Sequence, residues 1–151
     1  MKNRRQILQQ SAALAGLAAT GAWLPASALA YTKEAFEAKS VADALKAVGA
    51  GTPTESKEVT MTGPDIAENG AVVPLSVATS LAGVKQLMLL VEKNPNAVVA
   101  IFNTSEFVEA NFTTRAKLGQ SSDVYAIAVM NDGKALFAKK EVKVTLGGCG
   151  G

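Results

Sequence analysis

The residue type best suited to chemistry occurs once in this sequence, as Cys149, and it lies between two pairs of glycines. The segment reads Gly147-Gly148-Cys149-Gly150-Gly151. Because glycine adds no side-chain surface and leaves the backbone free to rotate, this pattern predicts a flexible, solvated arm over residues 147–151. Five residues reach roughly 17 Å when fully extended. We therefore expect a thiol on a slender tether that can enter a narrow cleft on another protein.

The remaining composition excludes most kinds of self-sufficient active site. The chain of 151 residues contains no histidine and no second cysteine. This rules out a Ser-His-Asp or Cys-His catalytic unit, a His-ligated zinc ion, an internal disulfide and a multi-thiolate metal site. A free cysteine has a pKa near about 8.5, and the nearest cation in sequence is Lys143. We therefore predict a carrier without metal or other cofactor, whose cysteine is activated by partner enzymes, rather than an enzyme.

A single modest domain, expected over residues 31–146, must position this arm, because a length near 150 residues favours one core. Its first element is predicted as a helix over residues 33–48, where Phe36, Val41 and Leu45 recur at nearly helical spacing. Glycines directly after this segment end it. The helix is expected to cover an edge or an end of a sheet.

From residue 57 onward the apolar residues alternate with a period of two, which predicts strands. The segments 84–91 and 97–102 are apolar on both faces and are predicted as central strands. The sequence Asn131-Asp132-Gly133 predicts a hairpin turn. About seven short strands with regular turns predict a mostly β fold, an immunoglobulin-like antiparallel β-sandwich with a short N-terminal helix.

The first 30 residues have the pattern of an export signal. Lys2, Arg4 and Arg5 precede an uncharged, Ala-rich stretch, and Ala28-Leu29-Ala30 fits a cleavage site. Adjacent arginines indicate the twin-arginine route, with an ordinary Sec signal and an N-terminal membrane anchor as alternatives. The signal holds three of the 15 Lys and Arg residues and none of the 13 Asp and Glu residues, so the mature chain carries a formal charge of −1. A nearly neutral domain argues against nucleic-acid binding.

The terminal pentapeptide and the order of elements resemble the SoxY family, the sulfur-carrier subunits of periplasmic SoxYZ complexes in thiosulfate oxidation. A second segment, Gly63-Pro64-Asp65-Ile66-Ala67-Glu68-Asn69-Gly70 followed by Val72-Val73-Pro74, is similar to the family's segment ahead of an early strand. Pro, Asn and Gly in this segment also fit a turn. The sequence does not distinguish whether Asp65, Glu68 and Asn69 contact a partner or solvent.

The resemblance implies a chemical cycle on Cys149. A c-type cytochrome partner joins thiosulfate oxidatively to the thiol as a cysteine S-thiosulfonate, and a hydrolase then releases sulfate. Where a sulfur dehydrogenase is present, it oxidises the remaining sulfane sulfur before a second hydrolysis restores the thiol. The resemblance also implies a SoxZ-like partner subunit in a heterodimer or larger assembly, a periplasmic location, and no membrane contact after signal removal.

Two other interpretations of the terminal segment stay open from the residues alone. The first is an ATP-dependent sulfur carrier that uses a thiocarboxylate on Gly151, against which export to an ATP-poor compartment counts. The second is an exported structural sandwich that dimerises through a Cys149 disulfide. Lipid attachment is disfavoured, because bacterial lipoprotein cysteines lie at the signal cleavage site.

Overall fold

The computed structural model describes residues 32–145, so the export signal and the glycine-flanked cysteine lie outside the described residues. No helix in residues 32–145 is long and apolar enough to cross a membrane. The helices and strands of this part are α2 (Lys33–Glu37), α3 (Val41–Ala47), β1 (Pro53–Glu55), β2 (Val59–Thr62), β3 (Ile66–Ala67), β4 (Val73–Thr79), β5 (Val84–Val91), β6 (Val98–Asn103), β7 (Asn111–Ala116), β8 (Ser122–Met130) and β9 (Ala135–Val144).

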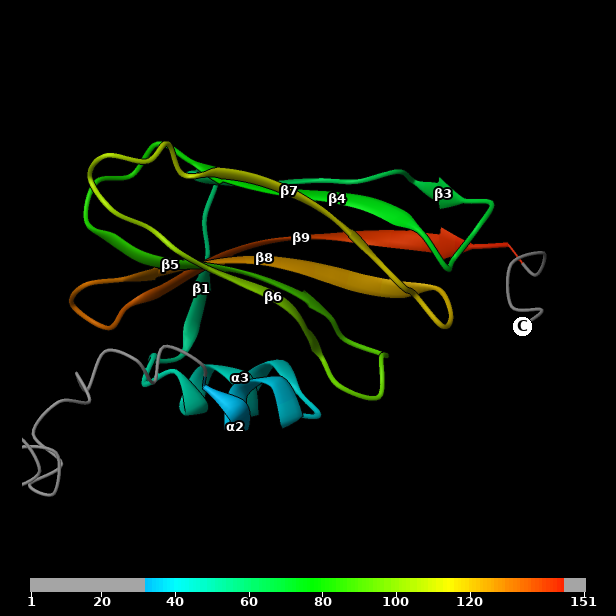
Figure 1. Ribbon diagram of the computed structural model, residues 1–151, viewed down its shortest axis with the longest axis horizontal. Coiled ribbons are helices and arrows are strands. Elements are labelled where there is room, and N and C mark those ends of the chain that lie inside the picture. The colour runs from blue at the N-terminus through cyan, green and yellow to red at the C-terminus, as the bar shows by residue number, and fades with distance from the viewer. Residues whose placement is uncertain (1–31, 146–151) are drawn as a thin grey trace, which may run out of the picture. The chain divides into compact units, whose positions relative to one another are not determined.

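The strands form two sheets that pack face to face, with the two helices on the outer side of one sheet (Figure 1). The larger sheet has the order β1-β9-β8-β5-β6, and β3 pairs with the end of β9. The smaller sheet has the order β2-β4-β7. All pairings are antiparallel except those of β1 and β3 with β9. The predicted mostly β sandwich is confirmed.

The main core lies between the two sheets and follows from the alternation seen in the sequence. Val73, Leu75 and Val77 of β4 are fully buried and belong to the same apolar cluster as Leu87 and Leu89 of β5. Their neighbours along each strand point to the opposite face, as the pleat requires. Burying each such side chain contributes about 1.5–3 kcal/mol. This core holds the two sheets together and so positions the loops and strand ends at both ends of the sandwich.

Two short helices replace the single helix predicted over residues 33–48. Ser40 has an extended backbone between them, and its hydroxyl accepts a hydrogen bond from the amide of Asp43 at 3.1 Å, which caps α3. Leu45 packs in a second cluster with Met88 and Ile127 on the outer face of the larger sheet. The prediction that the helix covers an edge or an end of the sheet is therefore wrong, because it covers a face.

Residues 84–91 and 97–102, the two segments predicted to be apolar on both faces, occupy different positions in the larger sheet. β5 lies between β8 and β6, as predicted for a central strand, whereas β6 is an edge strand, so that part of the prediction is wrong. The physical reason is that helices cover one face of the larger sheet and the second sheet covers the other. Both faces of β6 are therefore apolar even though one of its edges has no neighbouring strand in residues 32–145.

The predicted hairpin turn is confirmed, whereas residues 32–145 contain nine strands rather than the predicted seven or so. The predicted hairpin joins β8 to β9, where the amide of Met130 donates to the Lys134 carbonyl at 2.8 Å. Gly133 supplies the positive φ of +85° that this turn needs. The additional strands β1 and β3 contain three and two residues, which is too short for a pattern of period two to reveal them.

Candidate functional site

The predicted site residue, Cys149, and its flanking glycines Gly147, Gly148, Gly150 and Gly151 lie outside the described residues. The structure instead describes the point from which this segment continues, the end of β9 at Val144 and Thr145. Cys149 follows Thr145 by four residues, so its Cα lies no further than about 14 Å from the Thr145 Cα. An enzyme that takes up the thiol must therefore approach the surface around Thr145.

One side of the end of β9 is held by β3. The amide of Lys143 donates to the Asp65 carbonyl at 2.9 Å, and the amide of Thr145 donates to the Ala67 carbonyl at 3.1 Å. These bonds continue the parallel pairing of Ile66 with Lys143. The segment that resembles the SoxY family, residues 63–74, thus contains the strand β3 that holds residues 143–145, the last described residues.

The other side of the end of β9 is held by the β7–β8 connection. The amide of Val144 donates to the hydroxyl of Ser121 at 2.9 Å, and the amide of Leu118 donates to the Gly70 carbonyl at 2.7 Å. Gly70 is required here by close packing, because a Cβ would lie 2.6 Å from the Leu118 carbonyl oxygen and 2.8 Å from Val144 Cγ1. The end of β9 is therefore clamped from both sides.

We call residues 65–72, 117–121 and 143–145 the root surface, since they surround the base of the predicted arm. Two of its apolar side chains are more than half exposed, Ile66 at 57% and Val72 at 52%. Next to them, the Lys140 ammonium contacts the Asp65 carboxylate at 2.8 Å and donates to the Gly63 carbonyl at 2.6 Å. The root surface thus combines exposed apolar groups with the largely exposed carboxylate of Asp65, which pairs with Lys140 just outside these ranges.

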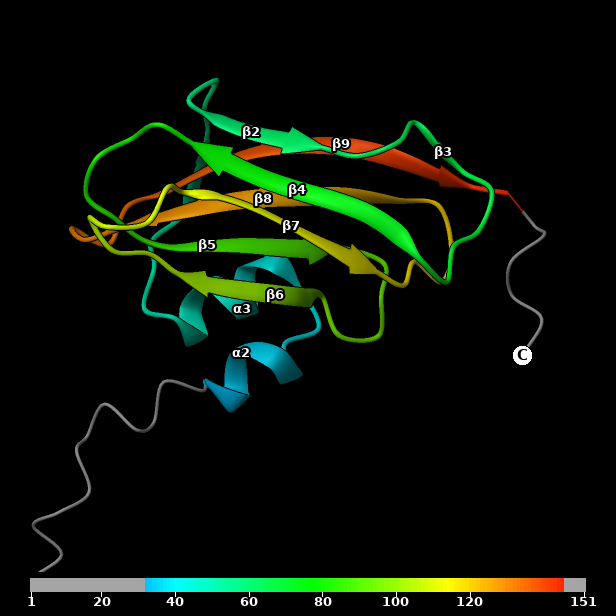
Figure 2. The same ribbon diagram turned by 45° about the horizontal axis from the view of Figure 1, so that its top comes forward.

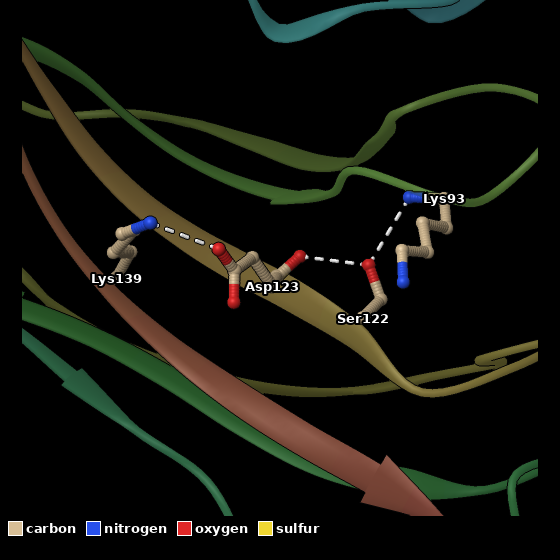
Figure 3. Close-up of polar contacts among 4 residues, drawn as sticks. All are labelled: Lys93, Ser122, Asp123 and Lys139. Carbon is tan, nitrogen blue, oxygen red and sulfur yellow. Dashed lines mark hydrogen bonds and ion pairs between the residues drawn. The ribbon is translucent and has the colours of Figure 1, made fainter.

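A buried serine connects the start of β8 to the loop after β5, as Figure 3 shows. The hydroxyl of Ser122 accepts from the amide of Lys93 at 3.1 Å and donates to the Asp123 carbonyl at 2.9 Å. Ser122 is the buried polar side chain of the described chain, and these two bonds satisfy it. Because Ser122 pairs with Val142 in β9, the bonds brace the strand that lies beside the end of β9.

Lysines close to the end of β9 are paired with carboxylates. The hydrogen bond and charge of Lys140 lower the pKa of Asp65 below its usual 3.8. Lys139 contacts Asp123 at 2.9 Å, and this hydrogen bond, with the nearby Tyr125 ring, raises the pKa of Lys139. Burial raises the pKa of Tyr125. Only Lys143, of the lysines in residues 139–143, forms no ion pair within the described chain.

The structure clarifies the three polar residues that sequence reasoning left open. Asp65 pairs with Lys140, and the side chain of Asn69 accepts from the amide of Ala71 at 2.9 Å, which confirms the predicted turn. Glu68 is exposed. Sequence reasoning missed Ser121, because no sequence signal separates a loop serine that holds a strand from one that faces solvent.

Residues 32–145 contain no group of acidic, cysteine or histidine side chains that could hold a metal ion. Two hollows of this part are lined by hydroxyl and apolar side chains together with Glu106 and Glu109 in one and Lys57, Glu58 and Glu109 in the other. The contacts described above instead hold the last described residues of β9 on both sides.

Comparison with known proteins places this chain in a family. A family model described as sulfur oxidation protein SoxY matches residues 44–149, a range that includes Cys149. The chain therefore belongs to the SoxY family. It is a sulfur-oxidation carrier that works in a SoxYZ-type complex with a partner subunit. No curated protein sequence matches the chain.

One solved structure supports the same assignment, and two others share the fold. The sulfur carrier protein SoxY from Chlorobium limicola f thiosulfatophilum is 30% identical, with a TM-score of 0.64 over 70% of this chain and 96% of that chain. A variant of the superoxide reductase (neelaredoxin) from Ignicoccus hospitalis is 20% identical, with a TM-score of 0.51 over 58% of this chain and 79% of that chain. A putative superoxide reductase from Thermotoga maritima is 12% identical, with a TM-score of 0.51 over 61% of this chain and 93% of that chain. The latter two show the shared fold alone.

Proposed function

We propose that this chain is an exported, periplasmic carrier that holds thiosulfate-derived intermediates covalently on Cys149. The observation that supports this most is the family match, which runs through residue 149 and so includes the glycine-flanked cysteine. Residues 1–30 act as the export signal, by the twin-arginine route, and residues 147–151 act as a flexible arm on the sandwich domain of residues 31–146.

The proposed loading step forms a sulfur–sulfur bond between the Cys149 Sγ and the sulfane sulfur of thiosulfate. The thiol loses its proton, two electrons pass to a c-type cytochrome partner, and the product is a cysteine S-thiosulfonate. A partner hydrolase adds one water to the terminal sulfone, which leaves as sulfate while a persulfide stays on the cysteine. Where a sulfur dehydrogenase is present, it oxidises that persulfide sulfur to a sulfonate with oxygen from three water molecules, releases protons and passes six electrons to a cytochrome acceptor. A second hydrolysis then releases sulfate and restores the thiol.

The root surface is the place where these enzymes dock. The reach of about 14 Å from Thr145 leaves a visiting enzyme in contact with the surface around the base of the arm. Ile66 and Val72 offer exposed apolar area there. The contacts that hold the end of β9 keep the start of the arm in place. Only the few residues beyond it then have to move for Cys149 to reach the active site of a partner enzyme.

An intact-mass measurement tests this function. Full-length chain, purified with its partner subunit after reaction with thiosulfate and the cytochrome, should gain the mass of a thiosulfate adduct that a reductant removes. The Cys149→Ser variant should gain nothing while keeping the wild-type unfolding midpoint. Sulfur found on the Gly151 carboxylate instead, or a disulfide dimer as the sole modified product, would contradict the proposal.

A further inference from the structure

The exposed large apolar residues of the described chain form two pairs at opposite ends of the sandwich. Ile66 and Val72 belong to the root surface, whereas Phe107 and Val108, 89% and 50% exposed, lie in the β6–β7 connection. β8 runs from one end to the other, and its nine residues span roughly 27 Å. Figure 2 shows the β6–β7 connection, in yellow, at the end away from the last residues of β9.

The edge of the larger sheet beside this second pair lacks charged protection. β6 contains neither charge nor proline, and within residues 32–145 it pairs with β5 alone. The opposite edge is protected, because β1 begins with Pro53 and ends with Glu55 and the middle of β9 carries Lys139, Lys140 and Glu141. Soluble proteins normally protect an edge strand with such residues, unless the edge is covered.

The backbone of β6 offers free hydrogen-bonding groups along this edge. The amide of Thr104 donates to the Lys85 carbonyl at 3.1 Å. In an antiparallel ladder these bonds recur at every second residue, so Phe102 and Ala100 bond to β5 while the backbone groups of Ile101 and Asn103 point away from it. The register shift near Leu89 disturbs the start of β6. The regular edge therefore covers residues 100–103.

The surface next to this edge suits a protein partner that carries positive charge. An open hollow of about 800 Å³ lies between residues 79–84 and 104–110, with Leu81 and Phe107 in its lining. Glu106 and Glu109 also line it, and no lysine or arginine does. The rings of Phe102 in β6 and Phe112 in β7 stack with centroids 4.6 Å apart and pack against the main core. An exposed aromatic side chain beside a hollow and two carboxylates is a typical anchor of a protein interface.

We infer that the β6 edge, residues 100–103, and the β6–β7 connection, residues 104–108, form the surface on which the partner subunit of the SoxYZ-type complex docks. The partner adds a strand to β6 and places basic side chains near Glu106 and Glu109. A permanent partner explains why this edge carries no protection of its own. Its position at the end opposite the root surface leaves the arm accessible to enzymes, and in this respect the inference rests on the proposed function.

Binding of the purified partner subunit to full-length variants tests this surface. The Asn103→Pro variant removes an outward amide without removing a bond to β5, and proline is tolerated at such edge positions. Asn103→Ala is its matched control, because it loses the same side chain, including the bond from Gln86 Nε2, and keeps the amide. We expect the dissociation constant to rise about tenfold or more for the proline variant and less than about twofold for the alanine variant.

The second pair of variants separates the two ends of the sandwich. Phe107→Ser should weaken partner binding about tenfold or more, and Val72→Ser at the root surface should leave it unchanged. All variants should keep the wild-type unfolding midpoint. Wild-type affinity in both Phe107→Ser and Asn103→Pro would overturn the inference, as would a homodimer of the chain that these variants dissociate while partner affinity holds. Cys149→Ser should bind the partner normally, so failure of the carrier chemistry and failure of this surface give different results.

Discussion

Replacing Gly70 with alanine measures how tightly the end of β9 is clamped. The new Cβ would lie 2.6 Å from the Leu118 carbonyl oxygen and 2.8 Å from Val144 Cγ1. Carbon and carbonyl oxygen approach to about 3.3 Å in favourable contacts, so the Leu118 backbone must move by about 0.7 Å. Leu118 is fully buried and its amide donates to the Gly70 carbonyl, so this movement disturbs both the core and a hydrogen bond.

The expected loss of stability is that of an overpacked site. Forced insertion of a methyl group into a close-packed region costs about 1–3 kcal/mol. For a domain of this size, a loss of 1 kcal/mol lowers the unfolding temperature by roughly 3–6 °C. The Gly70→Ala variant should therefore unfold about 3–18 °C below the wild type. Its Cys149 should also react more slowly with partner enzymes, because the base of the arm is displaced.

Two other glycines provide matched controls. At Gly119, one residue after Leu118, a Cβ has nothing within 4 Å, so Gly119→Ala should change the free energy of unfolding by less than about 0.5 kcal/mol. At Gly63 the nearest atoms are Leu75 Cδ2 at 3.0 Å and Met61 Cε at 3.3 Å. These are ends of side chains that can shift, so Gly63→Ala should fall between the other two.

Urea unfolding, followed by circular dichroism, measures the free energy of unfolding of the three variants. The values can be compared directly when the dependence of this free energy on urea concentration is the same for each variant. The order of destabilisation should be Gly70→Ala, then Gly63→Ala, then Gly119→Ala. Equal midpoints for Gly70→Ala and Gly119→Ala would refute the idea that close packing at Gly70 clamps the strand.

Two further predictions concern the ion pair and the arm. Since Lys140 lowers the pKa of Asp65, the pair stabilises the fold at pH values above the ordinary 3.8 and this contribution is lost as the pH falls through the lowered pKa. Asp65→Asn should thus be slightly less stable than the wild type at neutral pH and equal to it well below pH 3.8; a stability difference independent of pH would contradict this assignment. Valine at Gly148 or Gly150 should slow the reaction of Cys149 with partner enzymes, measured by adduct formation, without moving the unfolding midpoint. Unchanged rates would show that the enzymes do not need a slender arm.

Local sequence patterns predicted the features that depend on neighbouring residues. The alternation of Val73, Leu75 and Val77 places β4 in the core, and Asn131-Asp132-Gly133 forms the hairpin. These predictions succeed because strand periodicity and turn geometry are properties of a few consecutive residues. The division of the helical segment at Ser40 was missed, although the serine followed three residues later by Asp43 is a signal that could have shown it.

The place of each strand in its sheet could be learned only from the folded chain. β5 and β6 both place apolar residues on their two faces, yet β5 is central and β6 is at the edge. Helices and the second sheet bury the faces of a strand whether or not another strand lies beside it. The partners of β9 were equally hidden, since the pairing of residues 66–67 with residues 143–144 joins segments far apart in the sequence.

The chemistry of this protein can be read from its residue types: one thiol between glycines, no histidine to activate it, and therefore a carrier role. The support of that thiol comes from the fold. Gly70, Ser121 and β3 converge on the last residues of β9 through contacts that no local pattern encodes. The same packing separates the root surface from the unprotected edge of β6. Residue types thus indicate the chemistry proposed for residues 147–151, and long-range packing determines which surfaces are offered to the proposed partners.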